Sequence, residues 1–79
     1  MIDFKKYWKH SEDEPLSQIV IDGYYGEVGA GSGGYWGFIT KPNKTDINPP
    51  LNVRLQPELQ TWVEDTLQEL IEGGKDEKA

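Results

Sequence analysis

The sequence lacks cysteine altogether and contains a single histidine, His10. Without thiols, the chain can form neither a disulfide framework nor a thiolate site for zinc or nucleophilic chemistry. A lone imidazole has no second imidazole or thiol with which to share a metal ion. We therefore expect neither a zinc site nor a bound cofactor, and the missing thiols fit a reducing compartment.

Long hydrophobic runs are missing as well. The N-terminal segment contains no apolar stretch of the length that a signal peptide or a membrane span requires. We therefore expect a cytoplasmic, soluble protein that makes no membrane contact. The 79 residues suffice for one small domain over residues 1–79, in which residues 74–79 form a frayed tail.

Positive charge is scarce. Fourteen acidic residues outnumber eight lysines and arginines, which leaves a net charge of −6. Such a charge disfavours direct binding to a phosphate backbone or to anionic lipid, and it makes a basic protein surface the more natural partner. Solubility alone would also account for an acidic protein of this size.

The sequence also contains no motif that identifies an enzymatic reaction. Gly29-x-Gly31-x-x-Gly34 matches the dinucleotide-binding fingerprint literally, but that fingerprint requires a helix after its third glycine. Residues 35–39 are instead typical of a strand. Paired carboxylates for acid–base catalysis would need a substrate cleft, which so small a core can scarcely form. We therefore expect no enzymatic activity.

The most informative stretch of the chain is a predicted β-hairpin. Two runs of β-branched and aromatic residues, 17–25 and 34–41, flank a glycine-rich break from Gly26 to Gly34. This pattern predicts two strands joined by a mobile glycine loop. Asp22-Gly23 resembles a tight-turn dipeptide, but because strand-forming residues follow at once, we expect a bulge there instead.

The segments on either side of the hairpin are predicted to pack on it. Leu51, Val53 and Leu55 alternate with polar residues and predict a third strand over 51–55. Residues 1–10 predict a short helix whose aromatic side chains share one face. That face would dock on the sheet or on a partner.

The clearest helix begins at Gln56 and ends at the Gly73-Gly74 pair. Pro57 suits its first turn, and apolar residues recur at helical spacing behind it. The predicted fold is therefore α+β: a three-stranded antiparallel β-meander packed against a C-terminal amphipathic α-helix, with a short N-terminal helix. Its predicted core consists of Ile19, Ile21, Phe38, Val53, Leu55, Leu59, Trp62, Val63, Leu67, Leu70 and Ile71.

The polar side of this helix is acidic along its whole length. No lysine or arginine stands in residues 57–72, so no ion pair within the helix offsets the repulsion between its carboxylates. A helix whose carboxylates repel one another without such pairs is less stable than it need be, and this points to a partner for its acidic side. On the hairpin, an exposed aromatic side chain beside a glycine would make a protein-binding anchor. The predicted protein-binding residues are therefore Glu58, Glu64, Asp65, Glu69, Glu72, Tyr35 and Trp36.

These features predict a non-enzymatic inhibitor that occludes a basic surface of a nuclease or another nucleic-acid-processing enzyme, in the sharpest form as a mimic of nucleic acid. Inhibitors that phages direct against host defence enzymes, and immunity proteins that neutralise toxin nucleases, share this size and charge, although no motif connects the chain to either class. The alternative is a structural or accessory subunit that docks into a larger assembly through exposed hairpin aromatics. A homodimer is also open. A third hypothesis, nucleic-acid binding on a platform of stacking aromatics, lacks the positive groove that accompanies such platforms.

Overall fold

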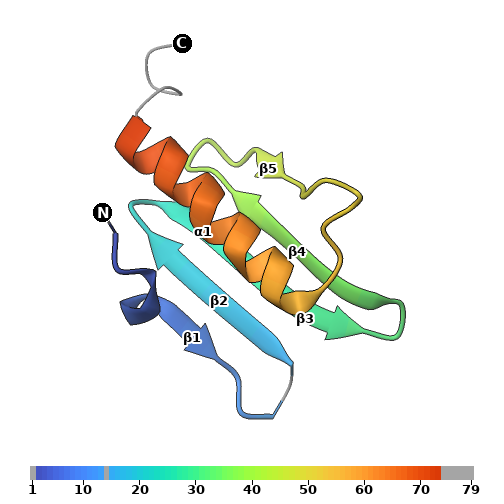
Figure 1. Cartoon of the computed structure of the whole chain (residues 1–79). Coiled ribbons are helices and arrows are strands. Elements are labelled where there is room, and N and C mark those ends of the chain that lie inside the picture. Colours follow the sequence, from blue (N-terminus) through green and yellow to red (C-terminus); the bar gives the residue numbers. More distant parts are fainter. Residues whose placement is uncertain (1, 14, 74–79) are drawn as a thin grey trace.

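An antiparallel sheet with one helix across one of its faces forms the described part of the chain (Figure 1). The computed structural model describes residues 2–13 and 15–73. Over these residues the sheet has five strands in sequence order, so each strand pairs only with its neighbours in the chain. In chain order the elements are a 3₁₀ turn η1 (Phe4–Lys6), β1 (Trp8–His10), β2 (Leu16–Ile21), β3 (Tyr24–Gly31), β4 (Gly34–Thr40), β5 (Asp46–Ile47) and α1 (Gln56–Gly73).

The α+β class and the C-terminal helix are thus confirmed, while the sheet has five strands where three were predicted. The tail predicted for residues 74–79 lies outside the described residues. Among the described residues, no helix has both the length and the apolar character needed to cross a membrane.

The hairpin of β2 and β3 closes at Asp22-Gly23, where a bulge was predicted. Both residues have positive φ, 53° at Asp22 and 85° at Gly23, as a two-residue turn between antiparallel strands requires. Ile21 and Tyr24 pair directly across the turn. The predicted bulge is therefore wrong, because two residues with this backbone conformation are enough to reverse the chain.

Most of the predicted glycine loop is strand. β3 continues to Gly31, pairs with both β2 and β4, and is joined to β4 by residues 32–33 alone. Gly26 shows why glycine occurs inside this strand: a Cβ there would lie 2.8 Å from Ile19 Cγ2 and 3.0 Å from Val63 Cγ1. Glycine at this position permits the close approach of α1 to the sheet.

Residues 51–55 do not form the predicted third strand. The Val53 N–H donates to the carbonyl of Pro50 in a turn, and Leu51 is 90% exposed. The strand that follows β4 is instead the short β5, which pairs with the end of β4. Pro49 and Pro50 have no N–H to donate to a ladder, so pairing does not continue from β5 into residues 51–55.

The N-terminal segment also differs from its prediction. The described residues 2–10 do not form the predicted α-helix; η1 leads into β1, where Trp8 pairs with Ile19 of β2. Phe4 and Trp8 are buried, whereas Tyr7 is exposed. A helix this short is marginal in isolation, and pairing with β2 satisfies the backbone groups of β1 while still burying two of the three aromatic side chains.

The core lies between the sheet and α1. Its most deeply buried members, Ile39 and Val63 among them, come from the middle of the strands and from the sheet side of the helix. The buried hydrophobic residues are Phe4, Trp8, Ile19, Ile21, Tyr24, Val28, Ile39, Leu59, Val63 and Leu67.

The predicted core is confirmed on β2 and along one side of α1. Two predicted members are not core: Phe38 stacks on Trp36 on the other face of the sheet, and Leu55 is exposed. Trp62→Ala is accordingly expected to cost less than a core truncation. The confirmed residues are Ile19, Ile21, Leu59, Val63 and Leu67, and those only partly buried at the border are Val53, Trp62, Leu70 and Ile71.

Alternation along the strands divides the sheet into two faces. The face beneath α1, here the covered face, bears the core side chains of β2, β3 and β4. The opposite face, here the open face, bears the side chains between them, including Val20, Tyr25, Trp36 and Phe38. Val20 is 61% exposed and Trp36 40% exposed, so the described elements leave this face accessible.

Candidate functional site

Three aromatic rings form a continuous row on the open face. The rings of Trp36 and Phe38 stack, with centroids 6.2 Å apart and planes 15° from parallel. The ring of Tyr25 meets Phe38 at 6.1 Å with a tilt of 46°. These residues come from β3 and β4, and the sheet fixes their spacing. We call them the aromatic row.

Gly29 on β3 provides the space in which Trp36 lies. The two residues are cross-strand partners. A Cβ at position 29 would lie 2.4 Å from Cζ2 of the indole, which no real contact allows. The six-membered ring therefore rests on the backbone of β3, while the indole remains partly exposed.

The polar end of Tyr25 is held by two neighbours on the same face. Its hydroxyl donates to Glu27 Oε1 at 2.9 Å and accepts from Gln18 Nε2 at 2.9 Å. Burial raises the pKa of Tyr25, and the hydrogen bond to Glu27 and its negative charge raise it further, while the Gln18 bond opposes them. The phenol is therefore fixed as a neutral donor at neutral pH.

The charges of the open face lie at its two edges and in its centre. At the β1 edge, Lys6 and Lys9 line a hollow of about 310 Å³ together with Tyr7, Gln18, Val20 and Tyr25. At the β5 edge, Asp46 Oδ1 accepts a hydrogen bond of 2.9 Å from the Thr40 hydroxyl. With Glu27 in the centre, the described residues place Lys6, Lys9, Glu27 and Asp46 on this face, so that positive and negative side chains occur together.

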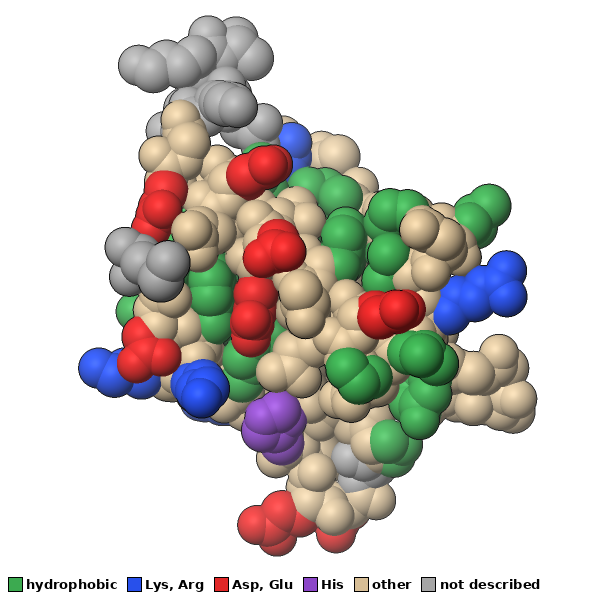
Figure 2. Space-filling view, in the orientation of Figure 1, with side chains coloured by type: hydrophobic (Ala, Val, Ile, Leu, Met, Phe, Trp, Pro, Cys, Tyr) green, Lys and Arg blue, Asp and Glu red, His purple; other side chains and the backbone are tan. Residues whose placement is uncertain are grey.

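On the far side of the molecule, acidic side chains follow one line along α1. Figure 2, viewed from the helix side, shows acidic side chains along the helix. Steps of three and four residues place the members on one side of a helix, pointing away from the core positions. This line, here the acidic stripe, consists of Glu58, Asp65, Glu69 and Glu72, with Trp62 among them.

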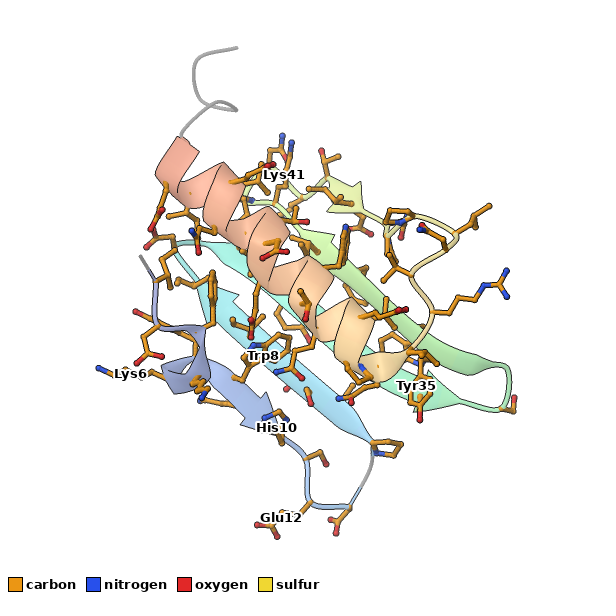
Figure 3. The ribbon with its side chains drawn as sticks, viewed as in Figure 1. Lys6, Trp8, His10, Glu12, Tyr35 and Lys41 are labelled. Carbon is orange, nitrogen blue, oxygen red and sulfur yellow. The ribbon has the colours of Figure 1, made fainter. Side chains whose placement is uncertain are left out.

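Two of the predicted acids hold the fold together. Trp8 Nε1 donates to Glu64 Oε2 at 2.7 Å, which ties β1 to α1 (Figure 3). Glu58 accepts the backbone N–H groups of Arg54 and Leu55, each at 3.4 Å, just ahead of the helix. By accepting these N–H groups, the carboxylate in the first turn satisfies donors at the start of the helix that have no partner within the helix.

Two other exposed acids of the stripe, Asp65 and Glu69, have no such task. Within residues 2–13 and 15–73, Asp65 and Glu69 make no hydrogen bond or ion pair. A shallow hollow of about 500 Å³ lies beside Asp65, and Val53, Pro57, Trp62 and Glu58 are among its other lining residues. An indole face next to two carboxylates matches the needs of a guanidinium group, which stacks on aromatic rings and binds carboxylates.

The structure separates the two predicted hairpin anchors. Tyr35 lies beside the first turn of α1 (Figure 3), where it lines a hollow of about 340 Å³ with His10, Ser17 and Gln56. Trp36 points to the open face. One flat partner surface can therefore meet the acidic stripe and Tyr35 together, but not the acidic stripe and Trp36.

His10 and Ser17 form a polar pair at the β1–β2 ladder. Their Nδ1 and Oγ atoms lie 2.6 Å apart, and Ser17 is only 5% exposed. The ring of His10 stacks on Trp8 at 6.3 Å. The part of the chain that the structure describes places no carboxylate in hydrogen bond with this ring, and it contains no cluster of three acidic or imidazole groups placed to hold a metal ion. The pair thus links two strands.

Sequence reasoning missed two members of the aromatic row, Tyr25 and Phe38, as site residues. A signal for Phe38 was present, since period-two alternation places it on the same face as Trp36. Tyr25 joins them only through the register between β3 and β4, which depends on where the turns lie.

Comparison with known protein families, with curated proteins and with solved structures finds no match for this chain. Its function must therefore be argued from its own surfaces.

Proposed function

We propose that this protein is a small, non-enzymatic inhibitor that binds a basic surface of a nucleic-acid-processing enzyme through α1 and thereby occludes it. The observation that carries the proposal is the hollow beside Trp62, where an apolar wall meets the carboxylates of Glu58 and Asp65. An arginine from the partner would find both a ring to stack on and a carboxylate to pair with.

The acidic stripe extends this recognition along the helix. Asp65 and Glu69 lie four residues apart, about 6 Å along the helix axis. Neither makes a hydrogen bond or ion pair within the described residues, so a partner can bind them without breaking a contact of the fold. Complementary charge speeds association and selects the partner more than it adds affinity, which suits an inhibitor that competes with nucleic acid for one groove.

The test is capture of partners from a host-cell lysate with the tagged protein, eluted by a salt gradient and identified by mass spectrometry. The Asp65→Asn, Glu69→Gln variant serves as the comparison, because it removes two charges from exposed side chains with no structural contacts. Asp13→Asn, Glu12→Gln is the matched control, since it makes the same two changes at exposed acids away from α1.

We expect the wild type and the control to retain a nucleic-acid-binding enzyme that elutes at moderate salt and whose activity the protein inhibits. The α1 variant should lose most of that capture. Equal capture by all three proteins, or a partner that resists high salt, would contradict the proposal.

A second candidate function is an accessory subunit that docks through its aromatics. The observation in its favour is Trp36, which is 40% exposed on a rigid strand. This candidate predicts a salt-resistant partner that is lost on substitution of Trp36 and retained when Asp65 and Glu69 are neutralised.

A further inference from the structure

The open face is unusual for this protein in having no net charge. The chain carries −6 overall, yet among the described residues the charged members of the five strands are Lys9, Glu27 and Asp46, all on the open face, and Lys6 lines the hollow beside Lys9. The excess negative charge therefore lies elsewhere. A neutral, aromatic surface on a strongly charged protein fits association through that surface.

We propose that the open face is the interface between two copies of this chain, packed sheet to sheet. The proposal is independent of the function proposed for α1. Packing the two open faces together buries the aromatic rows and leaves each α1 on the outside, so that the acidic stripes of the two copies lie as far apart as the fold allows (Figure 1). Sheets of this kind stack about 10 Å apart.

The positions of the charges select the orientation of the second copy. A two-fold axis parallel to the strands places β1 of one copy over β5 of the other, so that Lys6 and Lys9 meet Asp46 of the other copy. An axis across the strands would place β1 over β1 and bring lysine against lysine. The charge pattern is thus complementary to itself only in the first arrangement.

The size of the face predicts how stable the dimer is. β2, β3 and β4 contain 6, 8 and 7 residues. At about 3.4 Å per residue and about 4.8 Å between strands, the five-stranded sheet offers a projected area of about 400 Å². A standard stable interface buries about 800 Å² per partner. The interface is therefore at the small end of the range, and the dimer should dissociate on dilution.

Sedimentation velocity over a wide range of concentrations tests the proposal. The mass of the wild type should rise from one chain to two as the concentration increases. Val20→Glu places a carboxylate in the middle of the interface at a side chain that is already exposed, and it should remain a monomer. Leu51→Glu makes the same change of charge at an exposed residue outside the open face, and it should dimerise like the wild type.

A charge exchange tests the orientation. Lys9→Glu alone and Asp46→Lys alone should each weaken the dimer by about 10-fold or less, as rim charges do, and the two together should restore it. Circular dichroism confirms that each variant is folded. A double variant no tighter than the single ones would overturn the proposed axis.

Three results would overturn the dimer itself. They are a wild type that stays a monomer at every concentration, equal association of Val20→Glu and Leu51→Glu, and a monomeric wild type whose tryptophan fluorescence changes on addition of a single-stranded oligonucleotide. The last would assign the open face to nucleic acid through base stacking.

Discussion

The covered and open faces are built from alternate residues of the same strands, and both use glycine to admit a large neighbour. On the covered face, Gly26 and Gly37 let the side chains of α1 approach the sheet. On the open face, Gly29 lets the ring of Trp36 lie on β3. The two faces differ in what covers them. The helix α1 packs over the covered face, whereas on the open face the ring of Trp36 remains partly exposed. The first therefore stabilises the fold, and the second is available for association.

Truncation of a core side chain should give the largest difference between the faces. Leu67→Ala removes a fully buried side chain of α1 and should cost about 2–5 kcal/mol. Val20→Ala on the open face should change the free energy of unfolding of the monomer by about 0.5 kcal/mol or less. Urea unfolding at low protein concentration measures both. Equal losses would show that the open face is packed in the monomer.

The glycines provide a second comparison. Gly26→Ala places a Cβ within 2.8 Å of Ile19 and 3.0 Å of Val63, and overpacking of this kind costs about 1–3 kcal/mol. At Gly29 the three atoms nearest to a new Cβ all belong to the ring of Trp36, a side chain that is 40% exposed, so Gly29→Ala should cost less and should shift the tryptophan fluorescence. Thermal unfolding together with emission spectra distinguishes the two. A larger loss for Gly29→Ala would contradict the account.

The acids of α1 differ in whether they accept a hydrogen bond from another part of the fold. Glu64→Ala leaves the indole N–H of Trp8 without its partner and should cost about 1–3 kcal/mol. Glu69→Ala removes the same charge from the same helix and should stay within about 0.5 kcal/mol of the wild type. Denaturant unfolding of the pair is the measurement. Equal stabilities would mean that the Trp8–Glu64 bond contributes nothing.

The smallest expected effect concerns pH. The pKa of Tyr25 is raised by burial and then by Glu27, so the folded protein holds the phenol proton more tightly than the unfolded chain does. This contribution to stability is complete below the ordinary tyrosine pKa of about 10 and is lost as pH rises through the higher folded value. Tyr25→Phe should therefore lose less stability than the wild type above about pH 10. Unfolding temperatures that fall by the same amount in both proteins as the pH rises above about 10 would contradict this.

The sequence predicts the helix well and the sheet only in part. Helical spacing behind Pro57 depends on local residues alone, and α1 begins and ends where predicted. The sheet depends on pairing between segments. The two-residue turn at Asp22-Gly23 shifts every later register, and once it is placed, the glycines of 26–31 become strand residues.

The candidate site shows the same division. The acidic stripe follows from helical spacing, and its members are exposed as the pattern predicts. That Glu64 turns towards Trp8 could not be predicted, because it requires the position of β1 beside α1. That Trp36 and Tyr35 belong to different surfaces does follow from strand alternation.

The three tryptophans allow one measurement to test the central claim, that the two sides of the molecule have different tasks. Each indole N–H gives its own NMR resonance: Trp8 in the core, Trp36 on the open face, and Trp62 beside the acidic stripe. On dilution, only the Trp36 resonance should shift. On addition of an oligo-arginine peptide, only that of Trp62 should shift, and Trp8 should respond to neither. If Trp36 is unmoved by dilution, or if the peptide moves Trp36 and leaves Trp62 unchanged, the assignment of tasks to the two sides is wrong.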